Sequence, residues 1–293
     1  MNTVRTVAAL RAVLLDPRRS GRTIGLVPTM GAFHEGHLSL MRRARGECDV
    51  VVVSLFVNPT QFNESRDLDV YPRDEDRDAA RAQELGVDVL FAPAVAEVYP
   101  TGFATTVSLG GLTETLEGAH RGRAHFDGVT TVVTKLFNMV APDVAYFGQK
   151  DAQQALVITR LVRDLNMPVR IEVCATVREP DGLAMSSRNA LLSGDERQRA
   201  TALHRALLAA DAAVGEGVRN AAEVSARALS ELSRAEIEPE YLALVAPDTL
   251  EPVERIDEEV LALVAARIGD TRLIDNERLT APSRARADTN GRQ

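Results

Sequence analysis

The feature that most constrains the fold is a regular alternation of short apolar runs with longer amphipathic patterns. The apolar runs are rich in β-branched residues and occupy 23–29, 49–57, 87–93, 143–148 and 169–177. They are apolar on both faces, as strands buried in a parallel sheet are. Between them, apolar residues recur every three or four positions, the spacing of crossover helices, over 37–48, 74–86, 128–141 and 151–165. The alternation predicts an α/β domain with a Rossmann-like, doubly wound parallel sheet.

A different pattern begins after Val177. A polar loop is followed by alanine-rich helical patterns near 194–216 and 220–235, and then by strand-like runs at 240–247 and 260–276. This order predicts a smaller α+β domain. We therefore expect domains at 1–176 and 177–279 and a disordered tail at 280–293. Because ligand clefts commonly form between domains, the smaller domain is expected to act as a lid.

Composition and charge exclude several classes of protein. The 293 residues are enough for two domains that each bury a core, and the net charge of −8 opposes binding to nucleic acid or to anionic lipid. No apolar stretch reaches the ~18 residues that span a membrane, and residues 1–21 form an amphipathic pattern rather than a secretory signal. Cys48 and Cys174 lack the spacing of a metal site or a disulfide framework. We expect a cytoplasmic protein with reduced thiols and no membrane or nucleic-acid partner.

Two histidines follow the first apolar run, at the sheet edge where open α/β folds bind ligands. A helix is predicted to begin near His34 and His37, which would share one face of its first turn. Free backbone N–H groups and the positive end of the helix dipole lie at such a turn. Two imidazole donors there suit the α-phosphate of a nucleotide, whose oxygens gain charge during attack at phosphorus. Gly31 and Gly36 would let a ligand approach the backbone.

A surface pair or half of a zinc site is the alternative explanation of this spacing. Zinc would need a third protein ligand, and neither His120 nor His125 is placed in the sequence to supply one. The position after the first apolar run and the neighbouring glycines favour the phosphate site.

Polar groups also follow the second apolar run. Asn58 and Gln61 could hydrogen-bond the hydroxyl or carboxylate of a small substrate, with Phe56 and Phe62 as apolar walls. A turn with a proline stop at Pro59 explains the same residues equally well.

The chain has only two lysines, Lys135 and Lys150. Lys150 lies where the run at 143–148 meets a predicted helix N-terminus, and could offset phosphate charge. Asp151 would be a helix cap or a ribose acceptor, and Gln154, one turn along, would face the same cleft. The alternative for Lys150 is a solvated surface charge.

A polar loop at the domain junction carries two hydroxyls and a guanidinium. Ser186, Ser187 and Arg188 could form a flexible clamp that closes over a triphosphate and neutralises the departing pyrophosphate. Small polar loops are common on protein surfaces, but the clustering of all these motifs at strand ends and at the junction favours the clamp.

Together these motifs resemble those of a known family. A His-x-Gly-His after the first strand with a later Ser-Ser-Arg loop is similar to the adenylylating nucleotidyltransferases, a superfamily shared with class I aminoacyl-tRNA synthetases. Within it the chain closely resembles the pantoate–β-alanine ligases, over about residues 20–192 and more weakly through 276, in the motifs PTMGAFHEGHLSL, FVNPTQF, DLDVYPR, GVDVLFAP, EVYP, HFDGVTTVVTKLFN, FGQKDAQQ and GLAMSSRN. The resemblance implies a cytoplasmic homodimer that uses MgATP to join pantoate to β-alanine through a pantoyl adenylate.

The resemblance also implies roles for individual residues. The catalytic residues would be His34, His37, Lys150 and Arg188. Gln61 would bind pantoate and β-alanine, and Gln154 would bind pantoate. ATP would be bound by Met30, Gly31, Ala32, Phe33, His34, Glu35, Gly36, His37, Gly148, Gln149, Lys150, Asp151, Val177, Met185, Ser186, Ser187 and Arg188. Mg²⁺ would arrive with the nucleotide phosphates, and no protein ligand is assigned to it.

The chemical role of His37 has two interpretations. In members of the family, the histidine in the position of His37 is described as a proton donor. We favour stabilisation of transition-state charge, because a carboxylate nucleophile needs no base and pyrophosphate is a good leaving group.

One segment departs from the family pattern. Where the family reads EGxxRPGHF, this chain reads EGAHRGRAHF over 117–126, without the proline and with one extra residue. Either Arg121 or Arg123 could take the family's arginine position, and a role of this loop in substrate access is left open. EVYP in place of the usual EMYP is expected to be harmless.

Other functions fit parts of the sequence. A nucleotidyltransferase acting on a phosphate-bearing substrate would share the histidines, but the neutral amides of Gln61 and Gln154 suit a hydroxy acid better. A tRNA synthetase is disfavoured because the acidic chain has no evident anticodon domain. A regulatory protein that binds ATP without turnover would not need both histidines, Lys150 and the Ser-Ser-Arg loop.

Overall fold

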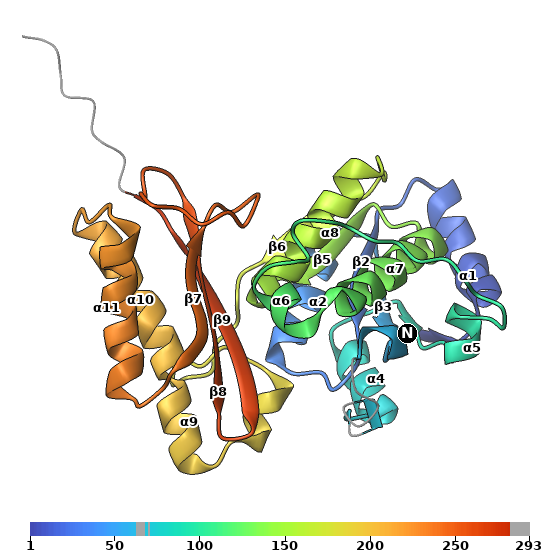
Figure 1. Ribbon diagram of the computed structural model, residues 1–293. Helices are drawn as coiled ribbons and strands as arrows, with labels where there is room; N and C mark the ends of the chain where they lie inside the picture. Colours follow the sequence, from blue (N-terminus) through green and yellow to red (C-terminus); the bar gives the residue numbers. More distant parts are fainter. Residues whose placement is uncertain (63–67, 70, 282–293) are drawn as a thin grey trace, which may run out of the picture. The chain divides into compact units, whose positions relative to one another are not determined.

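The computed structural model describes residues 1–62, 68–69 and 71–281, which form two compact units (Figure 1). Unit 1 comprises Met1–Glu179 and Ala184–Ser187, and unit 2 comprises Pro180–Leu183 and the described residues from Arg188 onward. The domain boundary at 176/177 and the action of 177–279 as a lid stay predictions. From residue 282 on, the predicted tail lies outside the described residues, as does part of the motif DLDVYPR.

Unit 1 is built on a parallel sheet with the strand order β1-β4-β3-β2-β5-β6. Its strands are β1 (Asn2–Val4), β2 (Ile24–Thr29), β3 (Val50–Leu55), β4 (Val89–Phe91), β5 (Val144–Gly148) and β6 (Arg170–Cys174). From β2 the chain runs outward through β3 to β4, and β5 then returns to the other side of β2. The predicted doubly wound α/β fold is therefore confirmed. The carboxyl ends of β2 and β5 flank the switch point, the place where such sheets bind ligands.

Helices cover both faces of this sheet (Figure 1). They are α1 (Val7–Arg19), α2 (Glu35–Glu47), α4 (Glu75–Glu84), α5 (Val95–Val98), α6 (Glu117–Arg121), α7 (Arg123–Val140) and α8 (Ala152–Asp164). Side chains alternate along β2: Leu26 joins the core that includes α1, α7 and α8, whereas Val27 joins the core that includes α2 and α4. The central strands are thus buried between two helical layers, as their apolar sequences predict.

Both edges of the sheet differ from the sequence-based prediction. The prediction omits β1, because three residues are too few to show a periodic pattern; this strand pairs with β4. The run at 169–177 is not buried on both faces: Arg170 is exposed and the rest of β6 is half-buried, because β6 forms the other edge. The charged side chains of Arg170 and Glu172 are compatible with that position.

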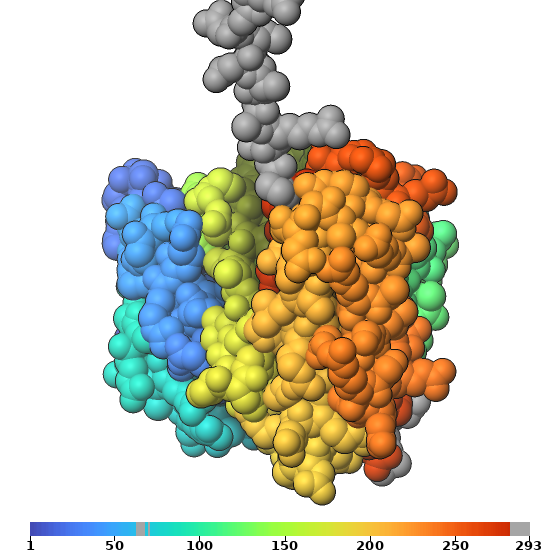
Figure 2. All heavy atoms as spheres, turned by 90° about the vertical axis from the view of Figure 1, so that its left-hand side faces the viewer, coloured from blue at the N-terminus to red at the C-terminus, as the bar shows by residue number. Residues whose placement is uncertain are grey.

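Unit 2 is an α+β unit, as the sequence predicts. Its antiparallel sheet contains β7 (Pro239–Val245), β8 (Val260–Ile268) and β9 (Thr271–Leu279), and its helices are α9 (Gly194–Ala200), α10 (Ala202–Gly215) and α11 (Ala221–Arg234). Figure 2 shows the outer surface of α10 and α11, in gold and orange. The helical pattern at 194–216 is interrupted at Thr201, whose hydroxyl donates to the carbonyl of Gln198 at 2.7 Å. This local side-chain bond competes with the helical backbone ladder.

Candidate active site

The structure gathers most of the predicted site residues at one edge of the unit 1 sheet. Residues 30–37 follow β2, Gln61 follows β3, Gly148 ends β5, and residues 149–151 follow it. Because β2 lies between β3 and β5, the three groups are neighbours at the carboxyl edge. Among them, Glu35 is exposed and pairs with Arg42 at 2.6 Å.

His34 caps helix α2. Its Nδ1 accepts the N–H of Gly36 at 3.2 Å, while Nδ1 of His37 accepts the N–H of His34 at 3.4 Å. These reciprocal bonds satisfy backbone donors of the first helical turn, as a capping box does. The two imidazole centroids lie 4.1 Å apart. The structure therefore brings the predicted pair together, although His34 precedes the helix instead of lying within it.

Both imidazoles are neutral and have the same tautomer. Burial lowers the pKa of His34, and the charge of Lys150 lowers it further. Burial also lowers the pKa of His37 to about 3, with a further decrease caused by His34. Because each Nδ1 accepts a backbone N–H, the proton of each ring is on Nε2. The site thus offers two uncharged N–H donors at a helix N-terminus, which suits an oxyanion that gains charge.

Helix α4 holds the loop that leads into α2. The carboxylate of Asp78, only 2% exposed, accepts the N–H of Ala32 at 2.7 Å and that of Phe33 at 2.8 Å. The guanidinium of Arg81 donates to the carbonyl of Phe33. Gly31 has a φ of +92°, and a Cβ there would lie 3.0 Å from Oδ2 of Asp78. The protein's own packing therefore requires this glycine.

The sequence does not single out Asp78 and Arg81 as residues that support the site. Helix α4 is rich in charged residues, so neither stands out from its neighbours. The available signal is the helical position of Asp78, which shares the buried side of α4 with Ala82. A carboxylate on that side must be paired, because an unpaired buried charge is costly.

The turn after β3 brings Gln61 to the loop after β2. This 3₁₀ turn, η1 (Pro59–Gln61), places Nε2 of Gln61 2.8 Å from Sδ of Met30, so two predicted ligand residues are in contact. Asn58 is 1% exposed, and its amide is bonded to Thr60, Gln61, Tyr99 and Gly128. The structure therefore places Asn58 in support of the turn.

The turn after β5 brings a cation to the histidines. This turn, η2 (Gln149–Asp151), carries Lys150, whose side chain is 18% exposed and whose charge helps to lower the pKa of His34 and His37. The ammonium of Lys150 lies 3.9 Å from Oδ1 of Asp151. Within the described residues, the side chain of Asp151 makes no capping bond to α8. Asp151 thus occupies the N-cap position of α8 without a side-chain capping bond, and its role as ribose acceptor stays a prediction.

Two adjacent glutamines on α8 have different surroundings. Gln153 is 3% exposed and anchors the segment before α6, because its side chain accepts the N–H of Glu117 and donates to the carbonyls of Leu112 and Thr115. Gln154 is half-buried, one helical turn after Lys150. Its predicted contact with substrate stays a prediction.

The segment around Met185 approaches the histidine turn. The N–H of Met185 donates to the carbonyl of Val177 at 2.9 Å, which joins two residues predicted to contact ATP. A Cβ built on Gly36 would lie 4.0 Å from Cβ of Met185, so the segment reaches the first turn of α2. The clamp stays a prediction for its remaining members, which are the half-buried Ser186, the exposed Ser187 and, in η3 (Ser187–Leu191) of unit 2, the exposed Arg188.

The segment that departs from the family pattern forms α6 and α7. The helices meet at Gly122, whose φ of +77° is easily adopted by glycine. Arg121 is 29% exposed and pairs with Glu117 at 3.1 Å, whereas Arg123 is 62% exposed. The less exposed of the two candidate arginines is therefore Arg121.

His125 supports the Gln61 turn from α7. Its Nδ1 donates to the carbonyl of Gln61 at 2.7 Å. Burial lowers the pKa of His125 to about 4, and the charge of Arg121 lowers it further, so the ring is neutral. The sequence gives no sign of this contact, by which His125 joins α7 to η1.

The paired histidines do not belong to a larger metal-binding cluster. Among the described residues, no group of three or more histidine, cysteine, aspartate or glutamate side chains is placed to hold a metal ion. Cys48 is buried and Cys174 half-buried, both as free thiols, and burial raises the pKa of Cys174 to about 11. In the described ranges, no helix combines the length and apolarity needed to cross a membrane.

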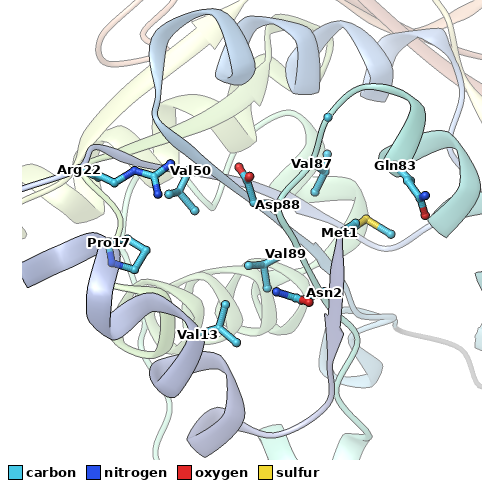
Figure 3. Close-up of a pocket in the computed structure, with 11 residues that line it drawn as sticks. Met1, Asn2, Val13, Pro17, Arg22, Val50, Gln83, Val87, Asp88 and Val89 are labelled. Atoms are coloured by element: carbon cyan, nitrogen blue, oxygen red, sulfur yellow. The ribbon is translucent and has the colours of Figure 1, made fainter. Parts of the chain in front are cut away.

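Two hollows lie away from the histidines. The first, of about 390 Å³, opens at the amino ends of β1, β3 and β4, with Arg22 and Asp88 in its wall (Figure 3). The second, of about 480 Å³, lies beside the carboxyl ends of β3 and β4, where Arg5 pairs with Glu75 at 2.5 Å. Neither His34 nor His37 is among the described residues that line these hollows. The candidate site is therefore defined by chemistry and topology, and not by the size of a cavity.

Comparisons with known proteins agree on one family. A family model described as pantoate-beta-alanine ligase matches residues 2–278. Pantothenate synthetases from Cereibacter sphaeroides and Moorella thermoacetica are 56% and 53% identical to the chain, over 93% and 94% of its length and 98% of theirs. A crystal structure of pantothenate synthetase from Thermus thermophilus is 50% identical, with a TM-score of 0.89 over 94% of this chain and 99% of that one. Pantoate-beta-alanine ligase from Francisella tularensis, crystallised with beta-gamma ATP and beta-alanine, is 34% identical, with a TM-score of 0.76 over 94% and 97%.

Proposed function

Because the chain belongs to the pantoate–β-alanine ligase family, we propose that its reaction takes place at the carboxyl edge of the unit 1 sheet, beside His34, His37 and Lys150. The activity is the ATP-dependent condensation of pantoate with β-alanine to give pantothenate. It proceeds through a pantoyl adenylate and releases pyrophosphate and AMP.

The observation that carries the proposed site is the neutral histidine pair beside Lys150. In the first half-reaction, a carboxylate oxygen of pantoate attacks the α-phosphorus of ATP, and the bond from that phosphorus to the pyrophosphate oxygen breaks. The Nε2–H groups of His34 and His37 donate to the α-phosphate oxygens as their charge grows, and Lys150 offsets charge on the phosphates. A carboxylate needs no base. In the ligand-free protein the pKa of His37 is about 3, so its ring is neutral at neutral pH, which favours charge stabilisation over proton transfer.

Gln61 and Gln154 hold pantoate through neutral amides. Such groups pair with a carboxylate and hydroxyls without adding charge at the reacting centre. Gln61 also lies near β-alanine in the second half-reaction. There the amine of β-alanine attacks the acyl carbon of the adenylate, the bond to the phosphate oxygen breaks, and the amine loses a proton as AMP leaves.

ATP is held by the predicted residues at 30–37, 148–151, 177 and 185–188. Mg²⁺ would arrive on the nucleotide and would neutralise phosphate charge there. The chain's own residues orient the nucleotide and donate to its oxygens.

The assembly and location of the protein belong to the same proposal. The family resemblance supports a homodimer in the cytoplasm, and the division of the chain near 180–188 supports a separate smaller domain. Closure of that domain over ATP is part of the proposal. Light scattering of the purified protein measures its mass in solution, and the mass of a monomer would contradict the proposed homodimer. X-ray scattering with and without ATP measures closure, and identical profiles would count against a lid.

The test is product release by the purified protein with MgATP. We expect pyrophosphate to appear when pantoate is added, and sustained release of AMP and pantothenate only after β-alanine is added. A folded protein that binds ATP but releases no pyrophosphate with pantoate would contradict the activity. Gln154→Ala should then raise the KM for pantoate more than the KM for ATP. An equal rise in both would place Gln154 outside the pantoate pocket.

A further inference from the structure

The amide of Asn58 uses both of its donors inside the protein. Its Nδ2 donates to the carbonyl of Gly128 at 3.1 Å and to Oε1 of Gln61 at 3.2 Å. Its Oδ1 accepts the hydroxyl of Tyr99 at 2.9 Å, together with the hydroxyl and the N–H of Thr60 at 2.9 and 3.4 Å. The residue is 1% exposed. A substrate could therefore reach the Asn58 donors only by displacing one of these partners.

These bonds determine which end of the Gln61 amide is available to a substrate. Oε1 of Gln61 accepts a hydrogen bond from Nδ2 of Asn58, so the end of the amide that remains for a substrate is Nε2. In the structure this Nε2 donates to Sδ of Met30, with 2.8 Å between the two atoms. A thioether is a weak acceptor, so a carboxylate or hydroxyl oxygen of a bound acid can replace it. Gln61 thus meets its ligand as a donor while Asn58 holds its oxygen.

The hydroxyl of Tyr99 is one of two donors within 2.9 Å of the Asn58 oxygen. Burial raises the pKa of Tyr99, which keeps the hydroxyl protonated and able to donate. Without this hydroxyl, Oδ1 of Asn58 would keep only Thr60 as a partner in a nearly dry environment. The amide would then be less firmly held in its present orientation.

The ring of Tyr99 is supported on several sides. Its centroid lies 5.1 Å from that of Phe103, in an edge-on arrangement, and 6.2 Å from that of Phe56. The ammonium of Lys135 lies 5.8 Å from the centroid of Tyr99 and 4.4 Å from that of Phe103. The hydroxyl therefore reaches Asn58 from a packed aromatic cluster that restricts its position.

We propose that Tyr99 is a positioning residue for pantoate, which acts through Asn58 on the amide of Gln61. The inference rests on the proposed function, because it takes Gln61 as a pantoate ligand. Tyr99 itself does not touch the substrate; its hydroxyl holds the Asn58 amide, which in turn keeps Nε2 of Gln61 directed to the acid. Loss of the hydroxyl should weaken pantoate binding roughly threefold to tenfold, the contribution of about one net hydrogen bond.

The first experiment compares Tyr99→Phe with wild type in the pyrophosphate-release assay. The substitution removes one oxygen and keeps the ring packing. We expect the KM for pantoate to rise roughly threefold to tenfold, while the KM for ATP stays within a factor of about two. The matched control is Tyr146→Phe, which removes a hydroxyl bonded to Glu47 at 2.9 Å and should leave both KM values unchanged. No change in Tyr99→Phe, or an equal rise for pantoate and ATP, would overturn the proposal.

The second experiment separates positioning through Gln61 from a general structural effect. Calorimetric titration gives the dissociation constant of pantoate for wild type, Tyr99→Phe, Gln61→Ala and the double variant. If Tyr99 acts through Gln61, adding Tyr99→Phe to Gln61→Ala should change that constant less than about twofold. The same factor in both backgrounds would overturn the proposal. Failure of the proposed function looks different, because wild type itself would then release no pyrophosphate with pantoate.

Discussion

The backbone N–H of His34 donates to Nδ1 of His37 at 3.4 Å, so the main chain links the two imidazoles before any ligand arrives. The return bond, from the N–H of Gly36 to Nδ1 of His34, completes the cap of α2. Both bonds use Nδ1, which puts both ring protons on Nε2. Donors that are already oriented need no rearrangement when charge develops on an oxyanion. In the proposed site, the cap that begins the helix would therefore also orient these donors toward the phosphate.

His37→Ala should fold and bind ATP but form pantoyl adenylate about 10²- to 10³-fold more slowly, the loss expected for one oriented donor to a developing oxyanion. Rapid-quench measurement of pyrophosphate formed with pantoate, without β-alanine, isolates this step. His120→Ala is the control, because His120 is an exposed histidine on α6. A near-normal rate for His37→Ala would show that His37 does not contribute to adenylate formation.

The lowered pKa values of His37 and His125 predict a pH-dependent stability. Both histidines protonate near pH 6.5 when unfolded, but the folded protein keeps them neutral down to about pH 3 and about pH 4. Below pH 6.5 the unfolded chain binds more protons than the folded protein, so the free energy of unfolding decreases as the pH falls, with a slope that approaches about 1.4 kcal/mol per pH unit for each histidine. Urea unfolding between pH 6.5 and 5 measures this decrease. His37→Asn should make it shallower, and an unchanged slope would contradict the neutral assignment.

Asp78→Asn should weaken the clamp on the loop before α2. The new amide NH₂ would face a backbone N–H of Ala32 or Phe33, which costs about 1–3 kcal/mol of stability for the unpaired donor. The rate of pyrophosphate formation should fall as well, because the loop positions His34. Asp76→Asn, on the exposed side of the same helix, should change neither stability nor rate. Denaturant unfolding and rapid-quench assays of both variants would decide; wild-type behaviour of Asp78→Asn would refute the clamp.

The sequence could predict the central elements because their signals are local. The apolar run at 23–29 contains β2, and the run at 143–148 contains β5, which is enough to place His34 and Lys150 beside the switch point. The edges are harder to predict from sequence. β1 is too short for a periodic signal and depends on β4 for pairing. The apolar residues of β6 are half-buried because β6 is an edge strand of the sheet formed by the described residues.

The supporting contacts of the site could not be read from the sequence because they join distant residues. Asp78 contacts Ala32 and Phe33 across more than forty positions, and Tyr99 contacts Asn58 across a similar distance. A single sequence contains no signal for such pairs. Glycine is also ambiguous: Gly31 fits both close ligand approach and tight internal packing, and the structure shows the second. Sequence patterns therefore identified candidate ligand residues, whereas the residues that orient them required the fold.

Gly128 should be essential for the contact between α7 and the Gln61 turn. A Cβ at this position would lie 2.5 Å from the carbonyl oxygen of Thr60 and 2.8 Å from the backbone nitrogen of Gln61, and backbone atoms cannot move aside cheaply. We expect Gly128→Ala to cost about 1–3 kcal/mol of stability through overpacking and to raise the KM for pantoate. Gly46→Ala is the matched control, because a Cβ in that turn of α2 meets no atom within 4 Å. Its effect should be stabilising by about 0.4–1 kcal/mol, since alanine loses less backbone entropy on folding. Thermal unfolding and pantoate titration of both variants measure the difference. If Gly128→Ala kept wild-type stability and pantoate KM, α7 would not be what holds Gln61 in place.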